Sequence, residues 1–481
     1  MKKIIISRLF LYKHRFVIGY IALGIAFIGL LFALPLLSPN GLSDAEMQSA
    51  TISANLEPDA ILKGNIVDLP YRLLQKFSIM IFGLSNYSVK LPSIILGFAL
   101  GLLLVILLNR WFKNNVSLLA SALVVLSTPF LYLTGTGTPL IMLVFWPTFL
   151  LWLGSKIQGV KRPEPRFCFI FAFAMLLSLF TPYMGYFALF CVLFVAFQPH
   201  LRFVVKNLPL IPLIITTTII LVGLIGILMN IIKAPSVIME LLFAKDYEIA
   251  RFFPNLSAGF APVFAWSNSL EGTILSPLIS LPTFALGLIG LLSTTKGFFA
   301  SRNSIASILL VFTVIITGFN PEAALFIILP FSVLAAHGIK YVLEKWYGLF
   351  PENPYARIFA LFPLAALLML TLQPSLLQYA YGYRYNPSVA YQFDTSLPIV
   401  KGKLTNETVI IKDQTKRDFY KLLERETDLR FVESVTPDIT GNIASFGKLE
   451  TVPAGHTLTR IITSEKSDNS DIIYLYTVEG E

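Results

Sequence analysis

Eleven apolar stretches recur along the 481-residue sequence, each near the length that an α-helix needs to cross a bilayer. They lie near residues 16–37, 91–108, 116–134, 139–155, 167–181, 182–198, 208–231, 276–293, 304–319, 321–340 and 356–373. Backbone groups inside a bilayer need hydrogen-bond partners within their own segment, so such stretches fold as helices. Only 14% of the residues are charged, against about 25% in soluble domains. The sequence therefore predicts a mostly α-helical, polytopic membrane protein with about 11 transmembrane helices.

The loops between these stretches carry an uneven share of the basic residues. If the N-terminus is cytoplasmic, the inside segments hold 18 Lys and Arg residues, and the outside segments within residues 1–373 hold 7. Basic loops favour the cytoplasmic side. We therefore expect a multi-pass protein of the plasma (cell) membrane with a cytoplasmic N-terminus and an extracytoplasmic C-terminal region. The net charge of +9 follows from membrane orientation, so we predict no nucleic-acid partner.

The chain divides into two predicted domains of opposite charge. Residues 1–373 form a transmembrane domain with long outer loops at 38–90 and 232–275, and their net charge is +12. Residues 374–481 have a net charge of −3 and an alternation of strand and helix patterns. Strands are expected at 408–412, 429–435, 457–463 and 472–478, and a helix at 416–427. This region is predicted to be a small extracytoplasmic α/β domain.

Several kinds of function are disfavoured by what the apolar stretches lack. They contain almost no ionisable residues, whereas ion-coupled transporters place such residues at the membrane midplane. The four histidines and two cysteines have no metal-ligand spacing, and no phosphate-binding glycine loop or serine nucleophile elbow is present. No cofactor and no metal site is predicted from motifs. Binding of a divalent cation by Asp44 and Glu46 stays open.

The first outer loop begins with a helix-start signal that also holds two acids. Ser43 followed by Glu46 resembles a capping box and predicts a helix through about Leu56. Asp44 lies in the first turn, where an acid stabilises the helix dipole. A carboxylate this close to the membrane surface could instead act as a general base on a hydroxyl acceptor. Both interpretations of Asp44 stay open on the residues alone.

A second helix is expected from Pro70 to Phe82, with Pro70 in its first turn and Gly83 as its terminator. One side of this helix forms an apolar stripe made of Leu73, Leu74, Phe77 and Ile81. Such a helix is expected to lie in the headgroup plane of the membrane.

Four short motifs lie in residues 16 to about 155: Ser43-Asp44-Ala45-Glu46, Asp68-Leu69-Pro70-Tyr71, Ile81-Phe82-Gly83-Leu84-Ser85 and Val89-Lys90-Leu91-Pro92-Ser93. Together they resemble the GT-C superfamily of membrane glycosyltransferases. The similar branch is that of the protein mannosyltransferases and aminoarabinose transferases, glycosyltransferase family 39 and relatives. The resemblance implies transfer of a sugar from a polyprenyl-phosphate carrier to a hydroxyl acceptor on the outer face of the membrane.

The resemblance also implies roles for individual residues. Asp44, assisted or replaced by Glu46, is the expected catalytic base, and Lys90 is the first candidate for the donor phosphate, with snorkelling to the interface as its other interpretation. Weaker candidates for the donor phosphate are Lys233, Arg251 and Arg384. Candidates for the substrate cleft are Asp68, Tyr71, Asp246 and Trp266. The aromatic residues of 245–266 fit sugar stacking or an interfacial belt. Expected partners are the polyprenyl-phosphate-linked sugar, a lipid, glycan or protein acceptor, and membrane lipids.

The chain also departs from the family pattern. Ala45 interrupts the usual adjacent Asp-Glu pair, the His-Pro-Pro before the second loop helix is absent, and the segment 134–139 contains no acid. A non-catalytic GT-C-like scaffold or lipid-carrier-binding protein is therefore the alternative function. A transporter of lipid-linked sugars is the third, although neither half-chain repeats nor buried charges favour it.

Overall fold

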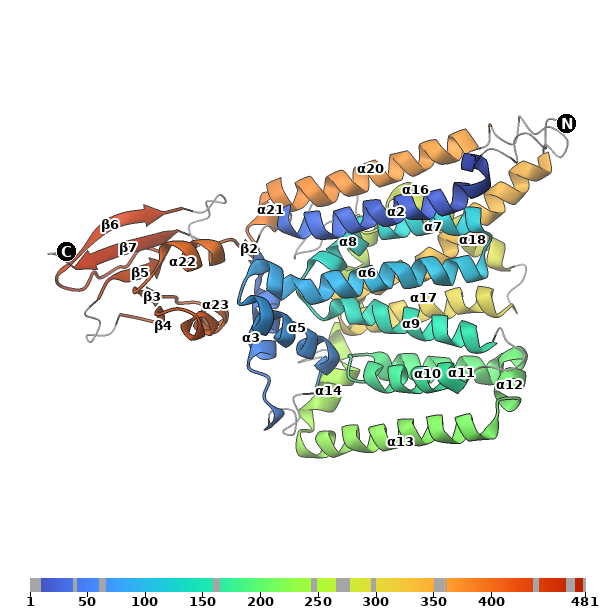
Figure 1. The fold of residues 1–481 in the computed structure, drawn as a ribbon, viewed down its shortest axis with the longest axis horizontal. Coiled ribbons are helices and arrows are strands. Elements are labelled where there is room, and N and C mark those ends of the chain that lie inside the picture. The colour runs from blue at the N-terminus through green and yellow to red at the C-terminus, as the bar shows by residue number, and fades with distance from the viewer. Residues whose placement is uncertain are drawn as a thin grey trace.

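The computed structural model describes residues 10–37, 41–59, 66–158, 165–243, 249–264, 277–295, 300–349, 359, 361–435, 441–463 and 472–478. Long helices form a bundle, and a smaller part with a β-sheet follows the last long helix (Figure 1). The first described residues, at Phe10, lie at one end of the bundle and the sheet lies beyond the opposite end. An odd number of spans, as predicted, would produce this arrangement.

Every predicted span contains a helix. The bundle helices are α2 (Phe10–Leu37), α6 (Asn86–Trp111), α7 (Asn114–Val125), α8 (Thr128–Gly135), α9 (Leu140–Gln158), α10 (Pro165–Ser178), α11 (Met184–Phe197), α12 (Pro199–Lys206), α13 (Leu210–Lys233), α16 (Leu281–Thr295), α17 (Ser301–Phe319), the 3₁₀ helix η2 (Pro321–Ile327), α18 (Ile328–Leu349) and α20 (Leu361–Tyr385). In the described part, five helices are long and apolar enough to cross a membrane. The bent pairs α7–α8 and α11–α12 raise this number to seven. The protein is therefore a multi-pass membrane protein, and the number eleven stays a prediction.

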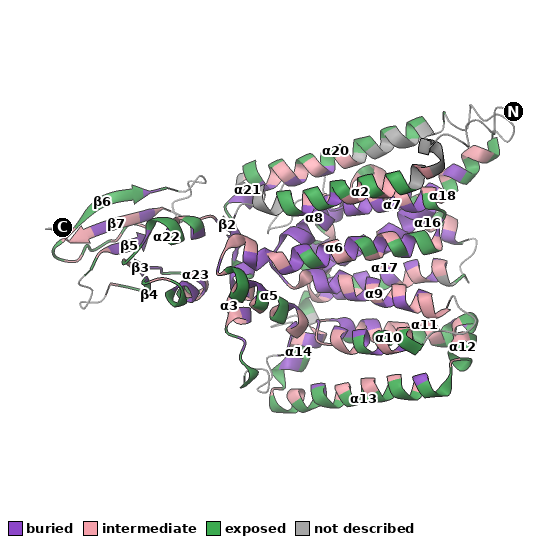
Figure 2. Ribbon diagram, viewed as in Figure 1, coloured by how far each residue is buried: buried purple, intermediate pink, exposed green. Residues whose placement is uncertain are grey.

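Burial separates the central helices from those at the edge of the bundle (Figure 2). The apolar window of the span that ends with α18 is 89% buried, whereas that of α13 is 11% buried. Small residues bring α18 against α16: a Cβ on Gly290 would lie 1.9 Å from the carbonyl oxygen of Leu334, and a Cβ on Gly338 would lie 2.0 Å from that of Leu286. Close backbone approach through glycine is the usual way in which membrane helices pack without a hydrophobic driving force.

Short elements cover the end of the bundle nearest the sheet (Figure 1). They are β1 (Leu42–Ser43), α3 (Asp44–Ala54), α5 (Leu69–Phe82), α14 (Ser236–Leu242), the 3₁₀ helix η1 (Ile249–Arg251), α15 (Phe252–Phe264), α21 (Pro387–Ala390) and β2 (Phe393–Asp394). Helices α3 and α5 match the two predicted loop helices. The whole predicted apolar stripe of α5 is exposed, and its polar Gln75 and Ser78 are buried. An exposed apolar side on a helix at the end of the bundle supports contact with the membrane.

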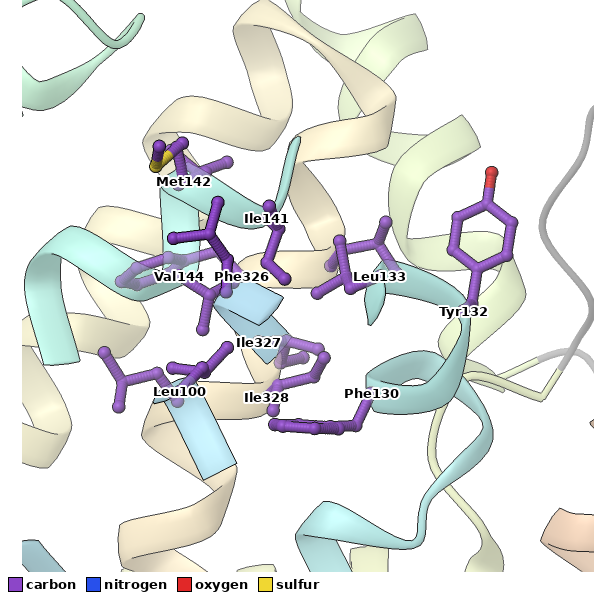
Figure 3. Close-up of a cluster of buried hydrophobic side chains, with 14 of the residues drawn as sticks. Leu100, Phe130, Tyr132, Leu133, Ile141, Met142, Val144, Phe326, Ile327 and Ile328 are labelled. Atoms are coloured by element: carbon purple, nitrogen blue, oxygen red, sulfur yellow. The ribbon is translucent and has the colours of Figure 1, made fainter. Parts of the chain in front are cut away.

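A close-packed core supports these end elements (Figure 3). It joins Leu100 of α6, Phe130 of α8, Ile141 and Met142 of α9 and Phe326 of η2, none more than 2% exposed. The first turn of α9 is therefore held against three neighbouring elements, and the loop that precedes it has a fixed position.

The part that follows α20 contains a five-stranded mixed sheet. Its strands are β3 (Thr408–Ile410), β4 (Arg430–Val432), β5 (Ile443–Phe446), β6 (His456–Ile462) and β7 (Ile473–Val478), in the order β4-β3-β5-β7-β6. β3 pairs in parallel with β4 and β5, and β7 pairs antiparallel with β5 and β6. Its helices are α22 (Leu397–Lys403), α23 (Gln414–Tyr420) and the 3₁₀ helix η3 (Lys421–Arg425). Four strands and the α23–η3 helix match the prediction, whereas β5 was not predicted.

The tail, defined here as residues 393–478, packs against the segment between α2 and α6. β1 and β2 form a two-residue antiparallel ladder in which Leu42 pairs with Asp394 and Ser43 with Phe393. Gly41 (φ 137°) precedes it, and a Cβ there would lie 2.5 Å from the carbonyl oxygen of Asp394. A shared hydrophobic core joins α3 to the tail through Met47, among others. Because α20 continues to Tyr385, the predicted boundary at residue 373 lies within a helix, and the division into two domains stays a prediction.

Candidate functional site

Helix α3 begins with the predicted capping box. The Ser43 hydroxyl accepts a hydrogen bond from the backbone N–H of Glu46 (3.3 Å), and the Glu46 carboxylate accepts one from the backbone N–H of Ser43 (2.8 Å). Reciprocal capping satisfies two backbone donors that the helix itself leaves unpaired. The start of α3 is therefore fixed by its own side chains.

Glu46 also reaches two partners outside its helix. Its second carboxylate oxygen accepts the backbone N–H of Gly137 (2.6 Å) and lies 4.0 Å from the ammonium of Lys90. The side chains of Glu46 and Lys90 are 0% and 1% exposed. The buried Glu46 side chain therefore connects α3 with α6 and with the α8–α9 loop, and it is not accessible to a substrate. A donor-phosphate contact at Lys90 stays a prediction, and it requires this buried pair to open.

Gln75 is a buried connection between four elements that sequence reasoning did not find. Its side-chain oxygen accepts hydrogen bonds from the hydroxyls of Ser49 (2.9 Å) and Ser53 (2.7 Å) of α3. Its NH₂ group donates to the carbonyl oxygens of Val89 (3.1 Å) and Gly137 (2.9 Å). Glu46 therefore binds the backbone N–H of Gly137, and Gln75 binds the carbonyl oxygen of the same residue. The loop that lacks the family's acid is thus bound to α3 through its backbone.

Asp44 lies in the first turn of α3 and is exposed. Protein atoms around the Asp44 carboxyl remove part of its solvation, and this raises the pKa of Asp44 above its usual value. The charge of Lys416 opposes this shift, and the carboxylates of Asp413 and Asp394 add to it. All three of these charged neighbours belong to the tail, and Lys416 itself lies 3.5 Å from Asp394. Asp44 therefore faces the junction with the tail.

Two adjoining cavities open at the same end of the bundle, each of about 230 Å³. Both are lined by Pro139 and Leu140, where the α8–α9 loop enters α9. The first, called here the Asp68 cavity, has Asp68, Tyr183, Glu240 and Asn320 as its main polar lining. The second, called here the Arg72 cavity, has Ser43, Gln48, Ser49, Arg72, Tyr132, Thr138 and Glu322. Residues from six segments far apart in the chain therefore meet around these two spaces.

The Asp68 cavity is built on two unusual backbone conformations. Asp68 (φ 54°) and Tyr183 (φ 66°) are the two non-glycine residues with positive φ in the described part of the chain. The backbone N–H of Asp68 donates to the carbonyl oxygen of Phe180 (2.7 Å), and that of Tyr183 donates to Leu241 (2.8 Å). Left-handed conformations cost free energy in residues other than glycine, and they concentrate at functional sites. The left-handed conformations of Asp68 and Tyr183 therefore support a functional role for this cavity.

The electrostatics of the cavity centre on Asp68, which is 8% exposed. Burial raises the pKa of Asp68 to about 7, the charge of Arg72 opposes the shift, and the carboxylate of Glu240 adds to it. A carboxylic acid that titrates near neutral pH is suited to proton transfer, because both of its protonation states are populated. Arg72, four residues further along α5, supplies a positive charge next to it.

The other predicted site residues are not brought together. Tyr71 is fully buried, and its hydroxyl lies 2.8 Å from that of Ser93. Lys233, Arg251 and Arg384 are exposed, and none of them lines either cavity in the described part of the chain. Asp246 and Trp266 lie outside the described residues.

Sequence reasoning missed most of the cavity's polar lining. Arg72 had a usable signal, because it follows Asp68 by one helical turn on α5. Three segments far apart in the chain supply Tyr183, Glu240, and the pair Asn320 and Glu322. No local sequence pattern shows that these segments meet. Among the described residues, no three His, Cys, Asp or Glu side chains gather in a metal-binding group.

Comparison with known proteins identifies the fold. No protein-family model and no curated protein matches the sequence. ArnT from Cupriavidus metallidurans, solved with undecaprenyl phosphate bound, superposes with a TM-score of 0.52 at 13% identity, covering 96% of this chain and 98% of that one. The Archaeoglobus fulgidus oligosaccharyltransferase tethered to an acceptor peptide gives 0.54 at 14% identity, covering 88% and 64%. Its AglB complex with an inhibitory peptide and a dolichol-phosphate gives 0.53 at 12% identity, covering 91% and 70%.

The chain therefore has the GT-C membrane glycosyltransferase fold over nearly its whole length. The resemblance found in four short motifs is confirmed at the level of the fold. At these identities the likeness carries no activity with it, because one fold hosts many functions.

Proposed function

We propose that this protein is a membrane glycosyltransferase that transfers a sugar from a polyprenyl-phosphate carrier to a hydroxyl acceptor at the tail-side end of the bundle. The observation that carries the proposal is the pair of adjoining cavities with a buried acid of pKa about 7 at one of them. A transfer reaction needs two substrates side by side, and two spaces with a common wall at Pro139 and Leu140 suit that need.

Asp68 is the acid that the geometry favours as general base. It lines its cavity, whereas Asp44 faces the tail and Glu46 is closed off by its hydrogen bonds. Asp68 would accept the proton of the acceptor hydroxyl as the oxygen attacks the anomeric carbon, and the bond to the carrier phosphate breaks. Arg72 would stabilise the negative charge that develops on the departing phosphate. Glu46 is then a positioning residue that holds the common wall through Gly137.

The carrier class is proposed from two supports. The ArnT and AglB structures contain undecaprenyl phosphate and a dolichol-phosphate. In this chain, α5 presents an exposed apolar side made of residues such as Phe77 and Ile81, and its opposite side carries Tyr71 and Arg72 towards the protein. A lipid tail in the membrane and its phosphate at Arg72 would therefore meet at one helix.

The test compares single acid-to-amide variants in the purified full chain. Transfer is measured from radiolabelled polyprenyl-phosphate sugars to acceptors in the source membranes. Asp68→Asn is expected to lower the rate by about 10²–10⁴-fold, the usual contribution of a positioned base. Asp59→Asn is the matched control, because Asp59 is an exposed acid of the same outer loop. Asp44→Asn tests the base expected from the sequence.

The outcomes separate the two candidate bases. Full transfer by Asp68→Asn with loss in Asp44→Asn would move the base to Asp44 and refute the assignment to Asp68. Loss in Asp68→Asn alone, with carrier binding retained, supports the assignment.

One observation favours the non-catalytic alternative. Both acids expected to be catalytic have structural roles: Glu46 caps α3 and binds Gly137, and Asp44 faces the charged groups of the tail. A scaffold that binds a lipid carrier would need the cavities without a base. Absence of transfer from every donor offered, together with retained carrier binding in wild type and in Asp68→Asn, would favour this function.

A further inference from the structure

A larger cavity lies in the membrane bundle, away from the site described above. It has a volume of about 430 Å³ and is formed between α2, α6 and α9, which follow one another across the bundle in Figure 1. Leu102 and Ile106 of α6 line it and are 45% and 44% exposed, so the cavity opens sideways, where a bilayer would surround the protein. This space is called here the α2–α6 groove.

Most of the groove is apolar, and glycine makes room for it. Gly24 of α2 lines it and has no atom within 4 Å of the place where a Cβ would be. Gly101 of α6 lies against the ring of Phe27, with the Cβ position 2.4 Å from that ring. The missing side chain of Gly24 therefore leaves open space in the groove, and that of Gly101 lets Phe27 pack against the backbone of α6. Such a shape suits a hydrocarbon chain running along the helices.

The end of the groove farthest from the tail is positively charged. Arg110 in the last turn of α6 and Lys156 in the last turn of α9 both line it. Arg110 donates from Nε and Nη2 to the carbonyl oxygen of Ser155 (3.0 and 2.7 Å), which fixes the plane of its guanidinium. Tyr20 and Asn109 add polar groups at the lining, and no acid is among the described residues that form it.

We infer that the α2–α6 groove binds one anionic phospholipid of the bilayer, with an acyl chain along Gly24 and the headgroup phosphate at Arg110 and Lys156. A zwitterionic lipid would bring its own cation next to the two cations of the groove, and a soluble anion would leave the apolar length unfilled. Basic pockets between transmembrane helices are suited to acidic headgroups, and each cation near the surface favours them. The inference is independent of the proposed transfer reaction, because the groove shares no residue with the two cavities.

The test measures lipid binding to the detergent-purified full chain by native mass spectrometry. Phosphatidylglycerol is compared with phosphatidylcholine of the same acyl chains. The double variant Arg110→Gln/Lys156→Gln is expected to bind phosphatidylglycerol about 30-fold more weakly, from about fivefold per cation. Lys206→Gln, an exposed cation in the last turn of α12, is the control and should bind as wild type does.

A second pair of variants tests the apolar part. Gly24→Leu fills the groove and should weaken phosphatidylglycerol binding about tenfold, the equivalent of about two displaced methylene groups. Gly29→Leu is matched to it: Gly29 is on the same helix, is equally free of neighbours within 4 Å, and does not line the groove. Thermal unfolding checks that each variant is folded.

The results decide the inference directly. Equal binding of the two lipids by wild type would refute it, as would equal phosphatidylglycerol binding by Gly24→Leu and Gly29→Leu. If Gly24→Leu does not fold, the charge variants decide alone, and unchanged headgroup preference in Arg110→Gln/Lys156→Gln refutes the site.

Discussion

The buried pair of Glu46 and Lys90 allows a quantitative prediction about stability. Replacing Lys90 by Met keeps most of the side-chain volume and removes the cation that lies 4.0 Å from a fully buried carboxylate. Removal of one partner of a buried ion pair costs about 3–5 kcal/mol, because the remaining charge is uncompensated. Glu46 still accepts the N–H groups of Ser43 and Gly137. We therefore expect the lower end of that range, about 3 kcal/mol.

The second half of the prediction concerns the double variant. Glu46→Gln should also destabilise, since Lys90 then lacks its carboxylate and one backbone donor loses its acceptor. In Glu46→Gln/Lys90→Met both charges of the pair are absent, and the hydrogen bond that Glu46 loses still costs about 1–3 kcal/mol. The two effects should therefore be strongly non-additive, with a coupling energy of at least about 3 kcal/mol in favour of the double variant, because the charge cost of Lys90→Met disappears.

Equilibrium unfolding in mixed micelles, followed by tryptophan fluorescence, measures the four free energies. Lys206→Met serves as the control, because Lys206 is exposed and should change stability by less than about 0.5 kcal/mol. Additive single and double variants would show that Lys90 and Glu46 do not interact, and the closed position assigned to Glu46 would be wrong.

Three further outcomes follow from the same contacts. Transfer should rise about tenfold between pH 6 and pH 8 as Asp68, whose pKa burial raises to about 7, ionises. The free energy of unfolding should fall between about pH 4 and pH 7, where the folded state holds the proton that the unfolded state has lost, and should level off by about pH 8. Asp68→Asn should remove both trends. Gly137→Ala should cost about 1–3 kcal/mol in thermal unfolding, since its Cβ would lie 2.8 Å from Cγ1 of Val89, whereas Gly154→Ala, with no neighbour within 4 Å, should be neutral. Glu426 is partly buried, but its hydrogen bonds lower its pKa below the usual value. The protection factors of the tail amides, which correct for slower intrinsic exchange in acid, should therefore fall as the pH drops below about 4.5, and Glu426→Gln should remove this dependence.

Local patterns were enough to predict the elements of the outer loop. The Ser43–Glu46 spacing predicted the start of α3, and the apolar stripe with Pro70 and Gly83 predicted α5, because each signal lies within one helix. The strand β5 was missed, since two of its four residues, Ala444 and Ser445, are weak strand formers and its two neighbours in the sheet come from elsewhere in the chain. Its identity as a strand depends on those neighbours.

The candidate site was predictable only in part, for a different reason. Asp44 and Asp68 were both named from sequence, but which of them faces a cavity depends on the surroundings of the two helices. The tail occupies the side of α3 on which Asp44 lies, through β1–β2 and α23. Gln75 was overlooked because its four partners lie 14 to 62 residues away in sequence. Contacts of that range leave no periodic pattern.

The ladder between β1 and β2 has a consequence for biosynthesis. Leu42 is made about 350 residues before its partner Asp394. At 5–20 residues per second, that interval lasts from about 18 to 70 seconds. During this time the N-terminal edge of α3 has neither its strand partner nor the tail half of its hydrophobic core. A chain truncated before residue 393 would therefore expose this apolar surface, and proteolytic quality control could use it to separate incomplete chains from complete ones.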